Sequence, residues 1–377
     1  MDVDGFFSIL EDLGAEFYTG VPDSLLSPFI DGIMDRYGVS DRHIVAANEG
    51  AAVGLVAGHY LATSRPAVVY MQNSGIGNAV NPICSLLHEK VYAIPVIFVI
   101  GWRGEPGTSD EPQHVFQGES TLPLLDCLEI PYAIVSKDSD LSPDVEKFKR
   151  YLSDGQSVAF VVRKGALQND KKMSYSSGAP LTRESALNII FTNSPCSGVF
   201  VCTTGKLSRE VFEIRKQAGR GHGNDFLTVG SMGHSLMIAC GIAISKPDRR
   251  VYCLDGDGAT LMHMGSMAVA GVHGCENLVH VVINNGAHET VGGLPAVSER
   301  FSLCEVARAV GYSQVFHTDD KEGLVAVLDC VEKSTGSVFV EIKCNLVSRP
   351  DLGRPTTSPI ENKNALMTEL RREVANG

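Results

Sequence analysis

Gly256-Asp257-Gly258 is followed, after residues 259–283, by Asn284-Asn285. Each motif comes just after a short apolar run, Val251–Leu254 or Leu278–Ile283, and such runs are typical of buried parallel strands. Between the motifs, apolar residues recur at helical spacing: Leu261, Met264, Met267, Ala268 and Val272. The sequence therefore predicts a β-α-β unit that brings a carboxylate and a carboxamide to neighbouring strand ends, the edge of an open α/β sheet where ligands bind.

The side chains of Asp257 and Asn285 carry hard oxygen ligands, which suit a Mg²⁺ ion shared with phosphate. Either motif alone is an ordinary turn. Together, at this spacing, they resemble the motif of thiamine diphosphate enzymes. The resemblance implies Mg²⁺ ligands from these two side chains and from the backbone carbonyl of Ala287. It also assigns three neighbours to cofactor binding: Gly256, Gly258 and Ala259.

Composition limits the class of protein. The chain has 377 residues, of which 44% are apolar, so it can bury a large core and divide into two domains. The net charge of −12 argues against a nucleic acid or an anionic membrane as partner.

The ten cysteines form no C-x-x-C pair, so we expect buried free thiols in a reducing compartment and no metal or redox role for them. We find no cationic leader and no apolar run long enough to span a membrane, and we expect a cytoplasmic protein.

Strand-like runs alternate with helical stretches on both sides of a polar segment near residues 165–182. This pattern predicts α/β architecture with two doubly wound parallel-sheet domains, over residues 1–172 and 182–377. Further predicted strands are Phe17–Thr19, His43–Ala46, Ala67–Tyr70, Val96–Ile100, Val158–Val162, Val199–Thr203 and Val338–Ile342. Predicted helices include Asp4–Leu13, Leu25–Tyr37, Glu49–Ala62 and His234–Ile244. The resemblance implies that the first domain binds the aminopyrimidine ring of the cofactor and the second its diphosphate, with no central third domain.

Glu49 follows the strand His43–Ala46 and begins a helix. The resemblance implies that its carboxyl group bonds the pyrimidine N1′ and activates the ring, a role for which an apolar cleft would raise its pKa. The alternative is an ordinary acidic residue at a helix N-terminus.

Gly230, Ser231 and Met232 precede another predicted helix, and the resemblance assigns them to the pyrimidine contact, with Met232 as an apolar wedge beneath the cofactor. Core filling is the alternative for Met232. Thr204 and Gly205 follow a strand, where hydroxyl and N–H groups suit diphosphate, although other βα turns look alike.

Asp23 lies just after the first predicted strand. It could act as a proton relay or as the N-cap of the helix that begins at Leu25, and the sequence favours the two roles equally. Asn73 and Ser74 follow the strand Ala67–Tyr70 and are candidates to face the substrate.

A Gly/Pro-rich polar loop, residues 102–114, follows the strand Val96–Ile100 and is predicted to be a lid. On it, Arg103 could grip an oxyanion and His114 could move a proton, or both could simply be solvated. Arg349 and Arg354 are further anion-binding candidates. Some thiamine diphosphate enzymes use a His-His pair, and here His114 alone occupies a comparable place.

Longer stretches resemble the phosphonopyruvate decarboxylase family: Gly20–Leu26, Gln72–Asn78, Trp102–Gly107, Asp110–His114, Gly286–Pro295 and Ser348–Lys363. The resemblance implies decarboxylation of 3-phosphonopyruvate to phosphonoacetaldehyde in phosphonate biosynthesis, with His288 near the substrate. It also implies a homodimer or larger homo-oligomer with active sites between subunits. The alternatives are a sulfopyruvate or broader 2-oxo-acid decarboxylase and, from another class, a non-catalytic regulator that binds the cofactor.

Overall fold

The computed structural model describes residues 1–273, 275–289 and 292–372. Two compact units divide the chain. One holds Met1–Ser174 with a short later segment, and the other holds Tyr175–Glu289 and Pro295–Gly377.

The first unit contains a six-stranded sheet in the order β2-β1-β3-β4-β6-β5, in which the paired strands run parallel. Its strands are β1 (Tyr18–Gly20), β2 (His43–Val45), β3 (Val68–Gln72), β4 (Ile97–Gly101), β5 (Tyr132–Val135) and β6 (Val158–Val162). Its helices are α1 (Val3–Asp12), α2 (Ser27–Tyr37), α3 (Glu49–Thr63), α4 (Ile76–Pro82), α5 (Pro112–Cys127) and α6 (Ser142–Ser153).

The central strands of this sheet are apolar along their whole length because helices cover both faces. On one face the ring of Phe160 meets Phe6 of α1 and Phe148 of α6 edge-on, with ring centroids 5.3 and 5.2 Å apart. On the other face Val53 and Val56 of α3 pack in a cluster with Val161 of β6.

The second unit contains a six-stranded parallel sheet in the order β13-β14-β10-β9-β7-β8. Its strands are β7 (Val199–Cys202), β8 (Asp225–Leu227), β9 (Val251–Gly256), β10 (Leu278–Asn284), β13 (Gln314–Thr318) and β14 (Val338–Lys343), beside the short β11 (Ala287–His288). The short β12 (Leu294–Pro295) lies where the chain passes from the first unit's later segment into the last part of the second. The helices of the second unit are α7 (Arg183–Asn193), α8 (Lys206–Gln217), α9 (Ser235–Ser245), α10 (Asp257–Met262), α11 (Gly265–His273), α12 (Leu303–Ala309), α13 (Lys321–Glu332) and α14 (Pro359–Leu370). Numbered from the first strand of each unit, both six-stranded sheets have the same order, 2-1-3-4-6-5.

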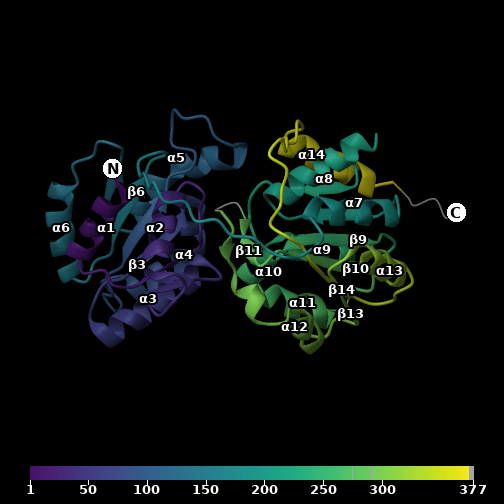
Figure 1. The fold of residues 1–377 in the computed structure, drawn as a ribbon, viewed down its shortest axis with the longest axis horizontal. Coiled ribbons are helices and arrows are strands. Elements are labelled where there is room, and N and C mark those ends of the chain that lie inside the picture. The colour runs from purple at the N-terminus through teal and green to yellow at the C-terminus, as the bar shows by residue number, and fades with distance from the viewer. Residues whose placement is uncertain (274, 290–291, 373–377) are drawn as a thin grey trace. The chain divides into compact units, whose positions relative to one another are not determined.

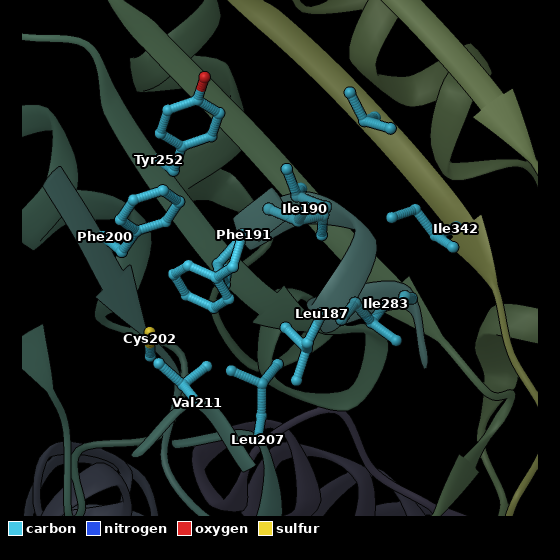
Figure 2. Packing of buried hydrophobic residues seen from close by; sticks show 14 of the residues in the cluster. Leu187, Ile190, Phe191, Phe200, Cys202, Leu207, Val211, Tyr252, Ile283 and Ile342 are labelled. Atoms are coloured by element: carbon cyan, nitrogen blue, oxygen red, sulfur yellow. The ribbon is translucent and has the colours of Figure 1, made fainter. Parts of the chain in front are cut away.

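Helices cover both faces of the second sheet as well, with α7 and α8 on one side and α11 and α12 on the other (Figure 1). Figure 2 shows part of the core on the α7 side, where Phe200 stacks on Tyr252 with ring centroids 4.7 Å apart and Phe191 reaches in from the helix. The predicted fold class, two doubly wound parallel-sheet units, is confirmed.

One predicted helix is broken in the structure. The apolar periodicity after Gly258 suggested a single helix, whereas α10 ends at Met262 and α11 begins at Gly265. His263, between them, has φ −133° and ψ 50°, outside the helical region.

In each sheet the strand order reverses direction next to the unit's first strand, between β1 and β3 and between β7 and β9. In open α/β sheets such a switch point opens a crevice at the carboxyl ends of the strands, and ligands bind there. The segments that leave these strand ends begin at Val21 and Asn73 in the first unit and at Thr203 and Asp257 in the second. Several of the predicted site residues, Asp23, Asn73, Thr204 and Asp257 among them, therefore lie at positions where this topology favours binding.

Candidate active site

Asp257 and Asn285 lie at the same edge of the second sheet, because their strands run side by side and end together. β9 pairs with β10 in parallel, with Gly256 opposite Ile283. Asp257 then begins α10, and Asn285 follows the last residue of β10. The motif spacing thus does correspond to neighbouring strand ends, as predicted.

The carboxylate of Asp257 is buried, and its contacts within the described residues include no cationic side chain. The residue is 3% exposed, and Ser298 Oγ, from the short turn Val297–Arg300, donates a hydrogen bond to Oδ2 at 2.5 Å. Burial raises the pKa of Asp257 to about 6, against the lowering effect of Ser298 and of backbone N–H groups. A buried anion without a counter-charge is costly, so a hard divalent cation at this carboxylate fits the site.

The two asparagines of the second motif, Asn284 and Asn285, make different contacts. Asn284 is buried, its Nδ2 donates to Glu341 Oε1 at 2.7 Å, and its Oδ1 accepts the N–H of Gly286 at 2.9 Å, so it shapes the turn. Asn285 is half-buried, and its Oδ1 accepts the N–H of Ala287 at 3.1 Å. The side-chain oxygen of Asn285 and the backbone of Ala287 are thus held close together on the turn that the metal-ligand prediction singled out.

A network of buried charges supports this turn, and it was not foreseen from the sequence. Asn285 Nδ2 lies 3.4 Å from Glu289 Oε2. Glu289 in turn pairs with Arg183 and, at 2.8 Å, with Lys206 Nζ. Arg183 also grips Glu210 through Nε and Nη2, at 2.6 and 2.7 Å. The network places Lys206, the first residue of α8, beside the turn and contributes cations near the expected diphosphate.

Two residues from separate segments, Met232 and His288, meet around the glycine after Asp257. A methyl group added at Gly258 would lie 3.5 Å from Met232 Cε and 3.3 Å from His288 Cε1. Met232 is only half-buried, so it does not fill the core. Its loop is constrained, because Ser231 has φ +53°, a conformation that non-glycine residues seldom adopt. Burial lowers the pKa of His288 to about 4, which keeps its ring neutral near pH 7.

The turn after β7 exposes the N-terminus of α8. Gly205 adopts φ +94° and immediately precedes the first helical residue, Lys206, while Thr204 is half-buried beside it. The unpaired N–H groups at a helix start bind anions well. This turn and Asp257 flank the β7–β9 switch point, which is the arrangement expected for a metal-bound diphosphate.

Glu49, in the first unit, is buried at the start of α3. It is 5% exposed, and Asn78 Nδ2 of α4 donates to its Oε2 at 2.7 Å. Burial raises the pKa of this carboxyl group above its usual value, and the bond from Asn78 works against that rise. Capping of α3 is the work of Asn48, whose Oδ1 accepts the N–H of Ala51 at 2.8 Å. Glu49 is therefore not needed as a cap.

Gly75 gives the Glu49 carboxylate its space. A Cβ atom added at Gly75 would lie 2.4 Å from Glu49 Oε1, a distance that real Cβ atoms essentially never show. The glycine is part of the stretch Gln72–Asn78, which the sequence singled out for a different reason.

Asp23 is 4% exposed, and burial raises its pKa to about 6, opposed chiefly by Arg103. The helix after it, α2, begins at Ser27 with Leu26 as its N-cap residue, so Asp23 is not that cap. Asp23 Oδ2 instead accepts the N–H of Leu25 at 3.1 Å. Of the two alternatives, the N-cap is therefore not observed, and the proton relay stays a prediction.

The segment after β4 is pinned rather than loose. Arg103 pairs with Asp110 through two bonds, Nε to Oδ2 at 2.8 Å and Nη2 to Oδ1 at 2.6 Å. Trp102 Nε1 donates to the carbonyl of Gly118 in α5 at 3.0 Å. His114, expected on the loop, is a buried residue in the first turn of α5, and burial lowers its pKa. The charge of Arg103 lowers the pKa of both Asp23 and His114, so it influences the two candidate proton-transfer groups together.

Asn73 holds this segment to α5. Its Nδ2 donates to the carbonyl of Arg103 at 2.8 Å and to Thr121 Oγ1 at 2.9 Å. Ser74 Oγ accepts a bond from Gln72 Nε2 at 2.7 Å. Substrate contact by Asn73 and Ser74 remains a prediction, whereas the observed role of Asn73 is to position Arg103.

The remaining arginine candidates lie elsewhere. Arg349 is engaged by carboxylates, at 2.9 Å from Glu184 and 3.3 Å from Asp351. Arg354 is exposed in the segment before α14.

Comparison with known proteins gives a family for segments of both units. Residues 3–124 match the family described as "Thiamine pyrophosphate enzyme, N-terminal TPP binding domain", and residues 203–342 match the corresponding C-terminal TPP binding domain. Phosphonopyruvate decarboxylases from Streptomyces viridochromogenes and Streptomyces hygroscopicus are 32% and 31% identical, each over 93% of this chain and 90% of the relative. A sulfopyruvate decarboxylase from Methanosarcina acetivorans is 24% identical over 84% of each chain. Within the described residues, no helix combines the length and apolar character needed to cross a membrane.

Proposed function

The chain belongs to the phosphonopyruvate decarboxylase family of thiamine pyrophosphate enzymes and is a carboxy-lyase, and on that premise we propose that it converts 3-phosphonopyruvate to phosphonoacetaldehyde and CO₂. The observation that carries the proposal is the similarity to two proteins of that name over 93% of the chain, which takes in both units. The cellular setting we propose is phosphonate biosynthesis in the cytoplasm, antibiotic pathways included. Because the chain belongs to a family of carboxy-lyases, the alternative function of a non-catalytic regulator that binds the cofactor is excluded.

The second unit would hold the diphosphate and its metal. We propose that Mg²⁺ takes the Asp257 carboxylate, the side-chain oxygen of Asn285 and the backbone carbonyl of Ala287 as ligands. The support is the buried, uncompensated carboxylate of Asp257 and the oxygen chemistry of this donor set. Thr204 and Gly205 would add donors at the start of α8.

The thiamine cofactor, when bound, supplies the electron sink that decarboxylation of a 2-oxo acid requires. This chain's residues bind it, orient it and manage protons. Glu49 would hold a proton at its buried carboxyl group against the pyrimidine ring, and Asn78 would orient that group. Gly230 and Ser231 would contact the same ring through their backbone, while Met232 would pack beneath it.

Asp23, Arg103 and His114 are the proposed substrate-side groups. Arg103 carries its charge beside Ser24 Oγ, 3.3 Å from Nη1, while Asp110 fixes the orientation of its guanidinium. With Nε and Nη2 bonded to Asp110, the Nη1 group would be the charge-assisted donor to an oxyanion such as phosphonate. His288, near Gly258, is the remaining candidate.

Substrate preference tests the proposal directly. We expect kcat/KM for phosphonopyruvate to exceed that for pyruvate at least about 100-fold, because charge-assisted hydrogen bonds to the phosphonate would be lost. Sulfopyruvate keeps a tetrahedral anion but carries less charge, so we expect it to be intermediate. Steady-state kinetics with the three acids under saturating thiamine diphosphate and Mg²⁺ gives the ranking. A clear preference for sulfopyruvate or for pyruvate would make the substrate assignment wrong.

The proton-relay role of Asp23 predicts a pH effect. The pKa of its carboxyl is about 6, so the protonated form disappears as the pH rises above 6, and kcat should fall with it. Asp23→Asn can still accept the bond from the N–H of Leu25, so the local turn is retained. We expect the variant to be slower and to lack this limb of the kcat profile, while Asp41→Asn at an exposed position keeps it. An unchanged rate and profile in Asp23→Asn would exclude the relay.

We also propose a homodimer or a larger homo-oligomer with active sites between subunits. Sulfopyruvate decarboxylase relatives are named as separate alpha and beta subunits, each matching about a third of this chain, which supports association between chains of this family. Exposed apolar residues on α3, Leu55 and Leu61, give one surface that association could cover.

A further inference from the structure

A cysteine, a histidine and a glutamate from three neighbouring elements converge in the second unit, and none of the three is assigned to the cofactor. Cys304 lies on α12, His317 on β13 and Glu341 on β14. The strands pair with His317 directly opposite Glu341, and α12 packs on both of them (Figure 1).

Two of the three distances between the ligand atoms match those of a tetrahedral metal site. Cys304 Sγ lies 3.3 Å from Glu341 Oε2, and His317 Nδ1 lies 3.7 Å from the same oxygen. The potential ligand atoms of the three residues all lie within 4.8 Å of one another. Bonds of 2.0–2.3 Å in a tetrahedral zinc site imply distances between ligand atoms of about 3.3–3.8 Å. The two distances to Glu341 Oε2 therefore already fall in the range of a tetrahedral site.

The two oxygens of Glu341 face different partners. Oε1 accepts the bond from Asn284 Nδ2 at 2.7 Å and lies 3.5 Å from Lys343 Nζ. Oε2 faces the thiol and the imidazole. A metal on Oε2 would therefore leave the bond to Asn284 in place.

The cluster is open to solvent on one side. The side chain of His317 is 48% exposed, whereas Cys304 and Glu341 are 6% and 4% exposed. An ion could arrive at the imidazole and then displace the thiol proton, which would leave to solvent. A second cluster of similar composition, Cys253, Asp255 and His280, is fully buried and gives a hydrated ion no such route.

We propose that Cys304, His317 and Glu341 form a binding site for one zinc-class divalent cation, with a fourth position open to water. Sulfur, imidazole nitrogen and a single carboxylate suit Zn²⁺ or Co²⁺, whereas Mg²⁺ prefers an all-oxygen shell. The cysteine spacing predicted no metal role, since a site assembled from three elements leaves no short motif. The proposal does not depend on the substrate of the enzyme.

Titration of the full-length protein with Co²⁺, in the presence of excess Mg²⁺ and thiamine diphosphate, tests the site. We expect one equivalent to produce thiolate-to-cobalt charge-transfer absorption, because Cys304 supplies a sulfur ligand. Co²⁺ at the oxygen site around Asp257 would give no such band. Zn²⁺ should displace the cobalt and abolish the absorption.

Variants assign the signal. Cys304→Ser should lose the charge-transfer band, and His317→Ala, at an exposed position, should weaken Co²⁺ binding at least about tenfold. Cys330→Ser, at an exposed cysteine elsewhere, should keep both the band and the affinity. The proposal is overturned if the wild-type protein gives no thiolate band at one equivalent, or if the band survives in Cys304→Ser. A failed decarboxylase assay would leave this readout unaffected.

Discussion

Glu49→Gln is expected to bind thiamine diphosphate and Mg²⁺ with nearly wild-type affinity and to lose decarboxylase activity by a factor of about 10²–10⁴, the usual contribution of a positioned acid–base group. Glutamine has almost the same shape as glutamate and can still accept the bond from Asn78. It cannot hold or release the proton that the pyrimidine ring requires. Calorimetry for binding and single-turnover kinetics for the chemical step separate the two effects.

The structure gives this loss its physical basis. The carboxyl group of Glu49 is buried and its pKa is raised, so it can share a proton near neutral pH more readily than an exposed glutamate. The lack of a side chain at Gly75 leaves the space in which this group lies. The substitution removes a buried ionisable group without adding bulk, so we expect the fold to persist.

A matched control tests the plainer alternative, that Glu49 merely favours a helix N-terminus. Glu322 lies in the first turn of α13 and is exposed. Glu322→Gln removes the same charge from the first turn of another helix and should leave activity unchanged. If Glu49→Gln turned over substrate at the wild-type rate, the acid–base role would be wrong.

The sequence predicted the fold well where strands are buried on both faces. β9 and β10 read as continuous apolar runs, and their pairing places Asp257 and Asn285 at one edge. The strands of the two six-stranded sheets that went unpredicted, β5, β8 and β13, all lie at sheet edges. Two of them, β5 and β13, are partly exposed, β13 also has polar residues within its run, and β8 has only three residues.

The candidate site, like the fold, was predictable from the sequence only in part. Candidate residues on strand-end motifs, such as Glu49 and Asp257, could be proposed from local sequence. Their supporting partners were not, because they come from remote segments: Ser298 lies 41 residues from Asp257, and Asn78 lies 29 residues from Glu49. A long-range hydrogen bond leaves no local pattern, so only coordinates reveal it.

Asp257→Ala is expected to abolish Mg²⁺-dependent binding of thiamine diphosphate. The carboxylate is the only charged group among the three proposed protein ligands, and its removal should weaken affinity by more than the roughly 10–100-fold typical of residues that merely orient a metal ligand. Isothermal titration of the variant with cofactor, at saturating Mg²⁺ and again in EDTA, measures the effect. Asp248→Ala, at an exposed position just before β9, is the control and should bind normally. Unchanged affinity in Asp257→Ala would refute the metal site.

Asp257→Asn separates loss of a metal ligand from loss of the fold. The pH dependence of the stability of the metal-free protein shows whether the carboxylate stabilises or destabilises the fold. Burial raises the pKa of Asp257 from 3.8 to about 6, so without metal its ionisation destabilises the fold as the pH rises from about 4 to 6. At about 1.4 kcal/mol per pKa unit, the cost above pH 6 is about 3 kcal/mol. Asparagine carries no charge and can still accept the bond from Ser298 Oγ. We therefore expect the metal-free variant to unfold at higher denaturant concentration than metal-free wild type at pH 8, to lose that advantage at pH 4, and still to fail to bind the cofactor through Mg²⁺. If the carboxylate serves to bind a cation, its negative charge destabilises the metal-free fold at pH 8, and its removal should stabilise the protein. A variant less stable than wild type at pH 8 would show instead that the carboxylate is structural.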